Sequence, residues 1–121
     1  MKRRFALWLF LAWAAAFPAA AETMRGVVIV VIDGDTVLFK PEHYSSTSRA
    51  FLKVRLADID APERDQAYGD VATRALTALL LNRQVEVDTV ATDKYDRTIA
   101  HMRLGALAVN AELVRQGVAW A

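Results

Sequence analysis

The chain has 121 residues, of which 15 are lysine or arginine, 14 are aspartate or glutamate, and none is cysteine. A chain of this length buries only about two thirds of its unfolded surface, which is enough for one small domain and not for two. The composition excludes a disulfide-stapled scaffold, and its near-neutral charge gives no general attraction to nucleic acid, so any polyanion site must come from locally placed cations.

The first 21 residues have the pattern of a secretory signal peptide. Cationic residues at positions 2–4 precede an apolar run from Phe5 to Phe17, and three alanines end the segment at Ala21. The run is shorter than the roughly 20 apolar residues of a spanning helix, so a membrane anchor is the weaker alternative. Cleavage near Ala21 would leave residues 22–121, with 12 basic and 14 acidic residues, as one periplasmic or secreted domain. We expect this mature form to be a monomer without a membrane segment.

Three strands are predicted in the first half of this domain. Gly26–Ile32 is almost continuously β-branched and is followed, after a tight turn or bulge at Gly34, by a second strand at Asp35–Phe39. A polar stretch, Pro41–Arg49, predicts a flexible loop. In Phe51–Ile59 apolar and polar residues alternate, which is typical of a half-buried strand.

Two helices and two strands are predicted in the second half of the domain. Apolar residues at three-and-four spacing within Val71–Leu80 predict the clearest helix. Two further strands are predicted at Gln84–Val90 and Ile99–Leu104, followed by a second helix at Ala108–Gln116, which Gly117 is placed to close.

Three strands, a helix, two strands and a helix do not follow the strict alternation of a parallel sheet. The order favours a mainly β fold with helices (α+β), built as a closed or nearly closed antiparallel barrel of five strands. Such a barrel is of the oligonucleotide-binding (OB) type, with a helix between strands 3 and 4 plugging one end. The other helix follows strand 5.

Two acidic clusters lie where strands end. Asp33-Gly34-Asp35 occupies the first strand break, and the segment 58–63 places Asp58, Asp60 and Glu63 just after a strand that carries Arg55. Phosphodiester hydrolysis needs an activated water, cations at the phosphate and commonly a metal, and carboxylates are hard ligands suited to calcium or magnesium. Taken singly, the first cluster could be a solvated turn and the second an ordinary helix entry.

A third polar segment, Asp93-Lys94-Tyr95-Asp96-Arg97, lies between two predicted strands. By itself it is most simply an exposed loop. Its arginine could also bind phosphate through two parallel hydrogen bonds, and its tyrosine could stack on a base.

Four motifs in order resemble the staphylococcal nuclease (thermonuclease) family. They are Val31-Ile32-Asp33-Gly34-Asp35-Thr36-Val37, Arg55-Leu56-Ala57-Asp58-Ile59-Asp60-Ala61-Pro62-Glu63, Thr92-Asp93-Lys94-Tyr95-Asp96-Arg97 and Val109-Asn110-Ala111-Glu112-Leu113-Val114-Arg115-Gln116-Gly117. The resemblance implies an OB barrel and a calcium-dependent nuclease that cleaves DNA and RNA to products with 3′-phosphates.

The resemblance also implies roles for individual residues. Asp35 and Asp60 would ligate Ca²⁺ with the backbone carbonyl of Ala61, and Glu63 would act as the general base toward the attacking water. Arg55 and Arg97 would bind the scissile phosphate, while Lys94 and Tyr95 would contact a neighbouring phosphate or nucleoside.

The sequence departs from the family pattern at three places. Ala61 stands where threonine is best known, and Asp96 stands where glycine is common, although aspartate tolerates a left-handed backbone better than most residues. After Gly117 the family continues through a tyrosine-bearing loop into a third helix, which we expect to be missing here. Two alternatives to an active nuclease therefore stay open: a non-catalytic OB-fold module that binds nucleic acid or protein, and an inactive truncated fragment.

Overall fold

The computed structural model describes residues 22–43 and 50–121, so the expected signal peptide and part of the expected loop lie outside the described residues. Within these ranges the chain forms six strands and two helices. In chain order they are β1 (Thr23–Val31), β2 (Thr36–Pro41), β3 (Leu52–Leu56), α2 (Gly69–Leu80), β4 (Gln84–Thr92), β5 (Thr98–Leu104), β6 (Leu107–Ala108) and α3 (Val109–Arg115). No helix in the described part of the chain is long and apolar enough to cross a membrane.

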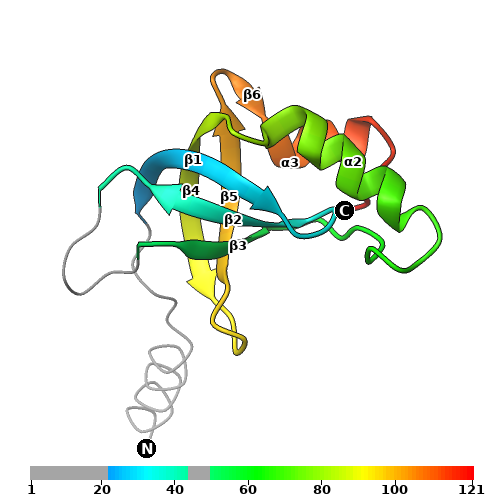
Figure 1. The fold of residues 1–121 in the computed structure, drawn as a ribbon, viewed down its shortest axis with the longest axis horizontal. Coiled ribbons are helices and arrows are strands. Elements are labelled where there is room, and N and C mark those ends of the chain that lie inside the picture. The colour runs from blue at the N-terminus through cyan, green and yellow to red at the C-terminus, as the bar shows by residue number, and fades with distance from the viewer. Residues whose placement is uncertain (1–21, 44–49) are drawn as a thin grey trace, which may run out of the picture.

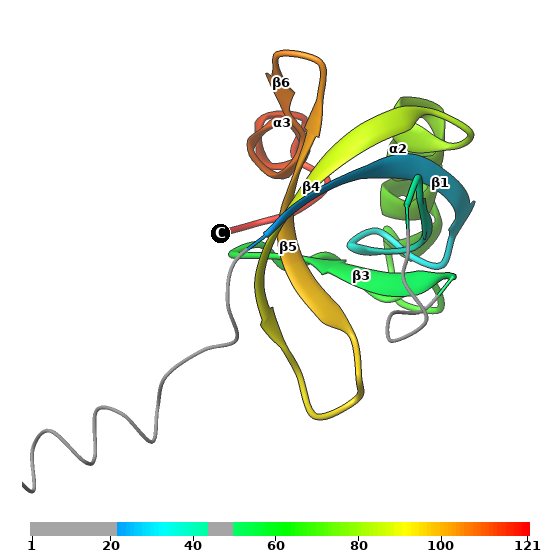
Figure 2. The same cartoon turned by 90° about the vertical axis from the view of Figure 1, so that its left-hand side faces the viewer.

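The strands form the predicted five-stranded barrel, to which the two-residue β6 is added at the edge of β5. β1 pairs with β2 and β4, β2 with β3, and β4 with β5, all antiparallel. The barrel closes through β3 and β5, which lie beside each other in Figure 2 and pair in parallel, with Arg55 opposite Ile99. The expectation of a purely antiparallel barrel is therefore wrong at this one seam. The reason is that α2 and β4 intervene between the two strands, so that β5 runs in the same direction as β3.

The barrel interior is filled by the side chains that alternate inward along each strand. Phe39, Val54 and Leu56 are fully buried there, and Leu76 and Leu80 of α2 belong to the same apolar cluster. This confirms the predicted plug by the first helix. In Figures 1 and 2 both helices lie toward the end of the barrel opposite the tip of the β4–β5 hairpin.

α3 is one residue shorter than predicted at each end: Ala108 still pairs with Arg103 in the β5–β6 ladder, and Gln116 is the residue that caps the helix after Arg115. Gly117 adopts a left-handed backbone with φ +77°. The chain then turns back, and the Val118 amide donates a hydrogen bond to the Leu113 carbonyl at 3.2 Å. This turn directs the last residues toward the loop that follows β3.

Glu112 on α3 supports a prediction about pH. Arg115 donates to both of its carboxylate oxygens, at 2.6 and 2.5 Å, and Gln116 donates at 2.8 Å, which together lower the pKa of Glu112 to about 2. A lowered carboxylate pKa adds stability above the unfolded-state value, and that stability is lost as the pH falls through the folded-state value. Glu112→Gln should therefore melt at a lower temperature than the wild type at pH 6. Thermal melts should show the gap closing between pH 4.5 and about pH 2, and a gap that does not depend on pH would contradict the assignment.

Candidate active site

The Asp33-Gly34-Asp35 turn is packed into the domain and is not a solvated turn. The amides of Ile32 and Asp33 both donate to the Thr36 carbonyl, at 2.9 and 3.3 Å. A Cβ atom on Gly34 would lie 2.7 Å from the Ala72 Cβ and 2.9 Å from the Ala61 Cβ. Glycine is thus required for the turn to pack between α2 and the loop after β3, which places Asp35 next to that loop.

Asp35 is a buried carboxylate, with 7% of its surface exposed. It accepts hydrogen bonds from the Thr36 hydroxyl at 2.9 Å and from the Ala61 amide at 3.2 Å. Burial raises the pKa of Asp35 above its ordinary value and a hydrogen bond with Asp33 adds to the increase, whereas the charge of Arg55 opposes it. The charge of Arg55 thus reduces the effect of burial on the pKa of Asp35 without reversing it.

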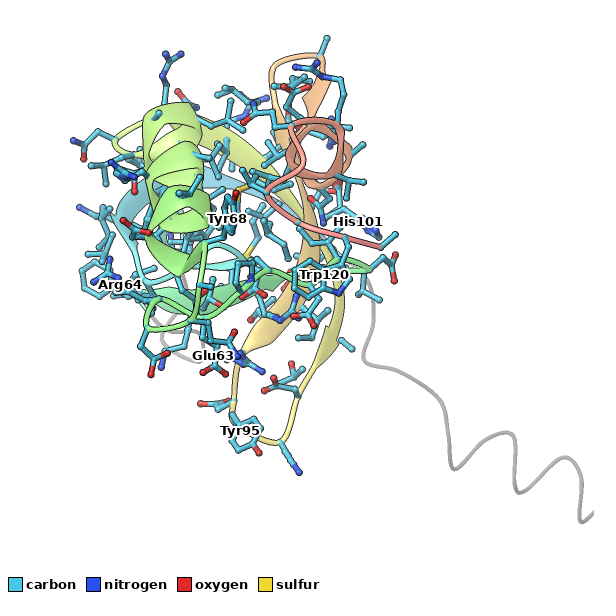
Figure 3. The ribbon with its side chains drawn as sticks, turned by 90° about the vertical axis from the view of Figure 1, so that its right-hand side faces the viewer. Glu63, Arg64, Tyr68, Tyr95, His101 and Trp120 are labelled. Atoms are coloured by element: carbon cyan, nitrogen blue, oxygen red, sulfur yellow. The ribbon has the colours of Figure 1, made fainter. Side chains whose placement is uncertain are left out.

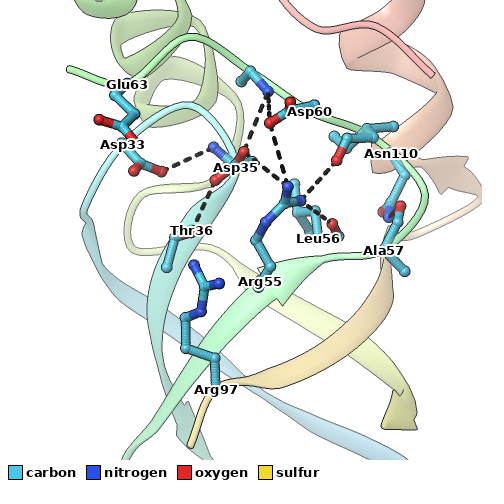
Figure 4. Close-up of polar contacts among 12 residues, drawn as sticks. Asp33, Asp35, Thr36, Arg55, Leu56, Ala57, Asp60, Glu63, Arg97 and Asn110 are labelled. Carbon is cyan, nitrogen blue, oxygen red and sulfur yellow. Dashed lines mark hydrogen bonds and ion pairs between the residues drawn. The ribbon is translucent and has the colours of Figure 1, made fainter. Parts of the chain in front are cut away.

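Arg55 on β3 supplies that positive charge. Its Nη2 atom lies 3.4 Å from a carboxylate oxygen of Asp35 and 3.4 Å from one of Asp60. Its Nη1 atom donates to the carbonyls of Leu56 and Ile59, at 2.6 and 2.7 Å (Figure 4). The side chains of Asp35 and Asp60 thus converge on a single cationic group, and the guanidinium of Arg55 is held in place by two carbonyl oxygens and by ion pairs with both acids.

Asp60 lies on the loop that leaves β3, and this loop begins earlier than the sequence predicts. The strand ends at Leu56, and Asp58 then takes a left-handed backbone with φ +63°. Asp60 forms an isolated antiparallel bridge with Trp120, whose two hydrogen bonds measure 2.8 and 2.9 Å. The backbone of Asp60 is therefore fixed while its side chain stays 59% exposed.

Glu63 lies on the same loop, just before α2. Its backbone amide donates to the Gln66 side chain at 2.7 Å, and its carbonyl accepts from the Gln66 amide at 2.9 Å. Its carboxylate is exposed and makes no hydrogen bond with any described residue, and Figure 4 shows it on the side of Asp33 and Asp35. This acid is therefore available to a solvent molecule.

The 93–97 loop is ordered by Asp93, which accepts from the amides of Tyr95 and Arg97, both at 2.9 Å, and from the Arg97 Nε at 2.8 Å. Desolvation acts to raise the pKa of Asp93, but these hydrogen bonds outweigh it and hold the pKa below its ordinary value. Asp96 has φ +64°, which confirms that aspartate adopts the left-handed conformation here. Together these contacts fix the direction of the Arg97 side chain.

Arg97 and Lys94 both lie against the ring of Tyr95. The Lys94 Nζ is 5.2 Å and the Arg97 Cζ is 5.6 Å from the ring centroid. The terminal nitrogens of Arg97 make no hydrogen bond within the described ranges, and in Figure 4 its guanidinium points toward the acidic group. Tyr95 is 67% exposed at the hairpin tip in Figure 3. Of the two arginines predicted to bind phosphate, Arg97 is the one whose two terminal nitrogens have no hydrogen-bond partner among the described residues, so both are available to phosphate oxygens.

The structure thus brings together Asp35, Arg55, Asp60 and Ala61, with Glu63 and Arg97 at the border of this group. Within residues 22–43 and 50–121, no three or more acidic or histidine side chains gather to hold a metal ion. Two carboxylates can contribute to a calcium site, because calcium takes six to eight oxygen ligands and accepts backbone carbonyls and water among them. This donor set fits a hard cation and does not fit zinc.

Sequence reasoning missed two residues that hold this loop. Trp120 pairs with Asp60 through its backbone, which no side-chain pattern could indicate. Asn110 is buried and bonded to the carbonyl of Ala57; the fourth motif contains this residue, but the motif does not indicate which backbone groups it contacts.

Comparison with known proteins identifies the relatives of this chain. A family model described as "Staphylococcal nuclease homologue" matches residues 53–121, a range that includes Arg55, Asp60, Glu63 and Arg97 but not Asp35. Protein ParB of Escherichia coli is 42% identical over 115 residues, covering 88% of this chain and 61% of that protein. Micrococcal nuclease of Shigella flexneri is 35% identical over 113 residues (86% and 61%), and Thermonuclease of Staphylococcus intermedius is 33% identical over 114 (85% and 64%). The chain spans about three fifths of the length of these relatives.

Proposed function

The chain belongs to the staphylococcal nuclease homologue family, and from that premise we propose that it is a calcium-dependent nuclease that hydrolyses DNA and RNA to products with 3′-phosphates. The observation that carries the proposal is that Asp35 and Asp60 converge on the Arg55 Nη2 atom, 3.4 Å from each carboxylate. Glu63, whose carboxylate has no hydrogen-bond partner among the described residues, lies on the same loop as Asp60. A non-catalytic binding module has no need of a buried carboxylate such as Asp35 beside an exposed acid.

Asp35, Asp60 and the carbonyl of Ala61 would hold the calcium ion. When bound, the ion would offset the negative charge of the phosphate and help to orient the attacking water. The hydrogen bonds of Asp35 with Thr36 and with the Ala61 amide fix its carboxylate before any ligand arrives. Such preorganisation is what a metal site requires of its surroundings.

Glu63 would accept a proton from the attacking water. Its carboxylate has no hydrogen-bond partner among the described residues, so its oxygens are available to water. The loop that carries it is fixed through its backbone by Gln66, so the carboxylate is presented from a defined position. General bases placed in this way typically contribute a factor of about 10²–10⁴ to the rate.

The two arginines would act differently on the phosphate. Arg97, oriented by Asp93, would offer its two terminal nitrogens to the oxygens on which charge develops in the transition state. Arg55 is bonded to carbonyls and to both acids, so it would contribute its charge from a fixed position. Lys94 and the exposed Tyr95 would contact the adjacent nucleotide, the tyrosine by stacking.

The proposal includes export of the protein as a periplasmic or secreted monomer after removal of residues 1–21. It is motivated by the cationic, apolar and small-residue pattern of that segment. The test is N-terminal sequencing of the exported protein, which should begin at Glu22. A protein that stays in the cell with Met1 in place would contradict it.

Removal of the metal tests the proposed activity directly. The protein should degrade single-stranded DNA when calcium is present and should lose that activity in a calcium chelator, because two carboxylates and a carbonyl cannot position water without the ion. The readout is the size distribution of a labelled oligonucleotide on a denaturing gel. Cleavage that persists in chelator would refute the calcium mechanism, and tight binding without any product over a long incubation would favour the binding-module alternative.

A further inference from the structure

Asn110 is a buried amide at the start of α3, with 7% of its surface exposed. Its Oδ1 accepts a hydrogen bond from the Met102 amide at 3.0 Å. Its Nδ2 donates to the carbonyls of Ala57 at 2.9 Å and Ala100 at 3.4 Å. One side chain therefore joins the second helix, strand β5 and the first residue after β3.

The segment from Ala57 to Ala61 follows β3 and carries two of the three predicted metal ligands, Asp60 and the carbonyl of Ala61. Asp58 within it is in a left-handed conformation, which costs free energy in any residue other than glycine. The segment must therefore be held by contacts from outside. Its first residue is fixed by the Ala57 amide, which donates to the Ala100 carbonyl at 2.7 Å, and by the Asn110 side chain.

The other end of the segment is held by residues that follow α3. After the turn at Gly117, Trp120 forms its two backbone hydrogen bonds with Asp60. The loop is thus held at two points, at Ala57 by Asn110 of α3 and at Asp60 by Trp120, which follows the helix (Figure 4 shows the Asn110 contact).

Burying an amide side chain costs more free energy than burying an apolar one, so packing alone does not explain Asn110. Removing an amide from water is unfavourable unless its donors and acceptors are satisfied, and an apolar residue of similar size would avoid that penalty. The hydrogen bonds of Asn110 fix a single arrangement of the three segments, which packing of apolar side chains does not guarantee. The Asn110 amide therefore sets the positions of these segments as well as filling space in the core.

We propose that Asn110 is a positioning residue for the active-site loop, which holds Ala57 so that Asp60 and Ala61 face Asp35. The expected effect on calcium binding rests on the proposed function, whereas the effect on the position of the Ala57–Ala61 loop is independent of it.

The experiment compares the full chain with Asn110→Ala, Asn110→Ser and a matched control, Val109→Ala. Val109 is the adjacent, fully buried residue of α3, so its truncation weakens the helix packing and removes no hydrogen bond to the loop. Backbone amide exchange at Ala57 and Asp60 is measured by nuclear magnetic resonance against the Val28 amide in the barrel core. Calcium binding is measured by calorimetry with calcium chloride alone.

In both Asn110 variants, exchange at Ala57 and Asp60 should accelerate about tenfold more than at Val28, and the calcium Kd should rise about tenfold or more, as for other residues that orient metal ligands. In Val109→Ala, exchange at the three amides should accelerate by the same factor, with the calcium Kd unchanged.

Equal acceleration of exchange at all three amides in the Asn110 variants would overturn the proposal. Failure of both variants to fold would also overturn it, because Asn110 would then hold the whole domain. A wild-type protein that takes up no calcium would refute the proposed function, while the exchange data would still decide the role of Asn110.

Discussion

Replacing Glu63 with glutamine is expected to lower the rate of nucleic-acid cleavage by about 10²–10⁴-fold. Glutamine has nearly the same shape as glutamate, but its amide cannot accept the proton of the attacking water. Because the Glu63 carboxylate is exposed and makes no hydrogen bond with the described residues, the substitution should leave the thermal melting temperature unchanged. The measurement is the initial rate at saturating calcium, with the melt as a check on folding.

The control for this prediction is Asp65→Asn, which neutralises another exposed acid two residues further along the chain. It should retain the wild-type rate, since it lies outside the group formed by Asp35, Arg55 and Asp60. Full activity in Glu63→Gln would remove Glu63 from the mechanism. An equal loss in both variants would show that only the local charge matters.

Replacing Gly69 with alanine is expected to affect both stability and rate. A Cβ atom at this position would lie 1.8 Å from the Glu63 carbonyl oxygen, a contact that only a shift of the backbone can relieve. Overpacking of this kind typically destabilises a domain by about 1–3 kcal/mol. The shift would also displace Glu63, and a misplacement of about 1 Å can reduce a rate roughly 100-fold.

Gly105→Ala provides the matched control, because a Cβ atom there meets nothing within 4 Å although the residue has φ +60°. Left-handed strain should destabilise this variant by about 1–2 kcal/mol without changing the rate of the folded protein. Denaturant unfolding and initial rates separate the two cases. A Gly69→Ala variant as active as Gly105→Ala would contradict the proposed dependence of Glu63 on this packing.

Much of the fold follows from local patterns in the sequence. Alternation in Phe51–Ile59 predicts β3, and the three-and-four spacing within Val71–Leu80 predicts α2, because burial of one face requires those periods. The parallel seam between β3 and β5 could not be predicted in this way. Strand direction at that seam depends on the path of the chain through α2 and β4, which no local pattern records.

The candidate site was predictable in its residue types but not in its connections. The motifs locate Asp35, Asp60 and Glu63 near strand ends. They do not show that the long Arg55 side chain lies between two acids, because the direction of a flexible side chain depends on acceptors far from it in sequence. The contacts of Asn110 and Trp120 with the loop join residues more than 50 positions apart and are set by tertiary packing.

In the proposed reaction, this domain directs water onto a phosphodiester bond so that the 3′-phosphate is retained. Digestion of a short DNA oligonucleotide in ¹⁸O-labelled water with calcium, followed by mass spectrometry of the fragments, tests it most directly. We expect fragments that end in a 3′-phosphate carrying one ¹⁸O atom, with unlabelled 5′-hydroxyl partners. Fragments with 5′-phosphates, or an oligonucleotide left intact, would contradict it.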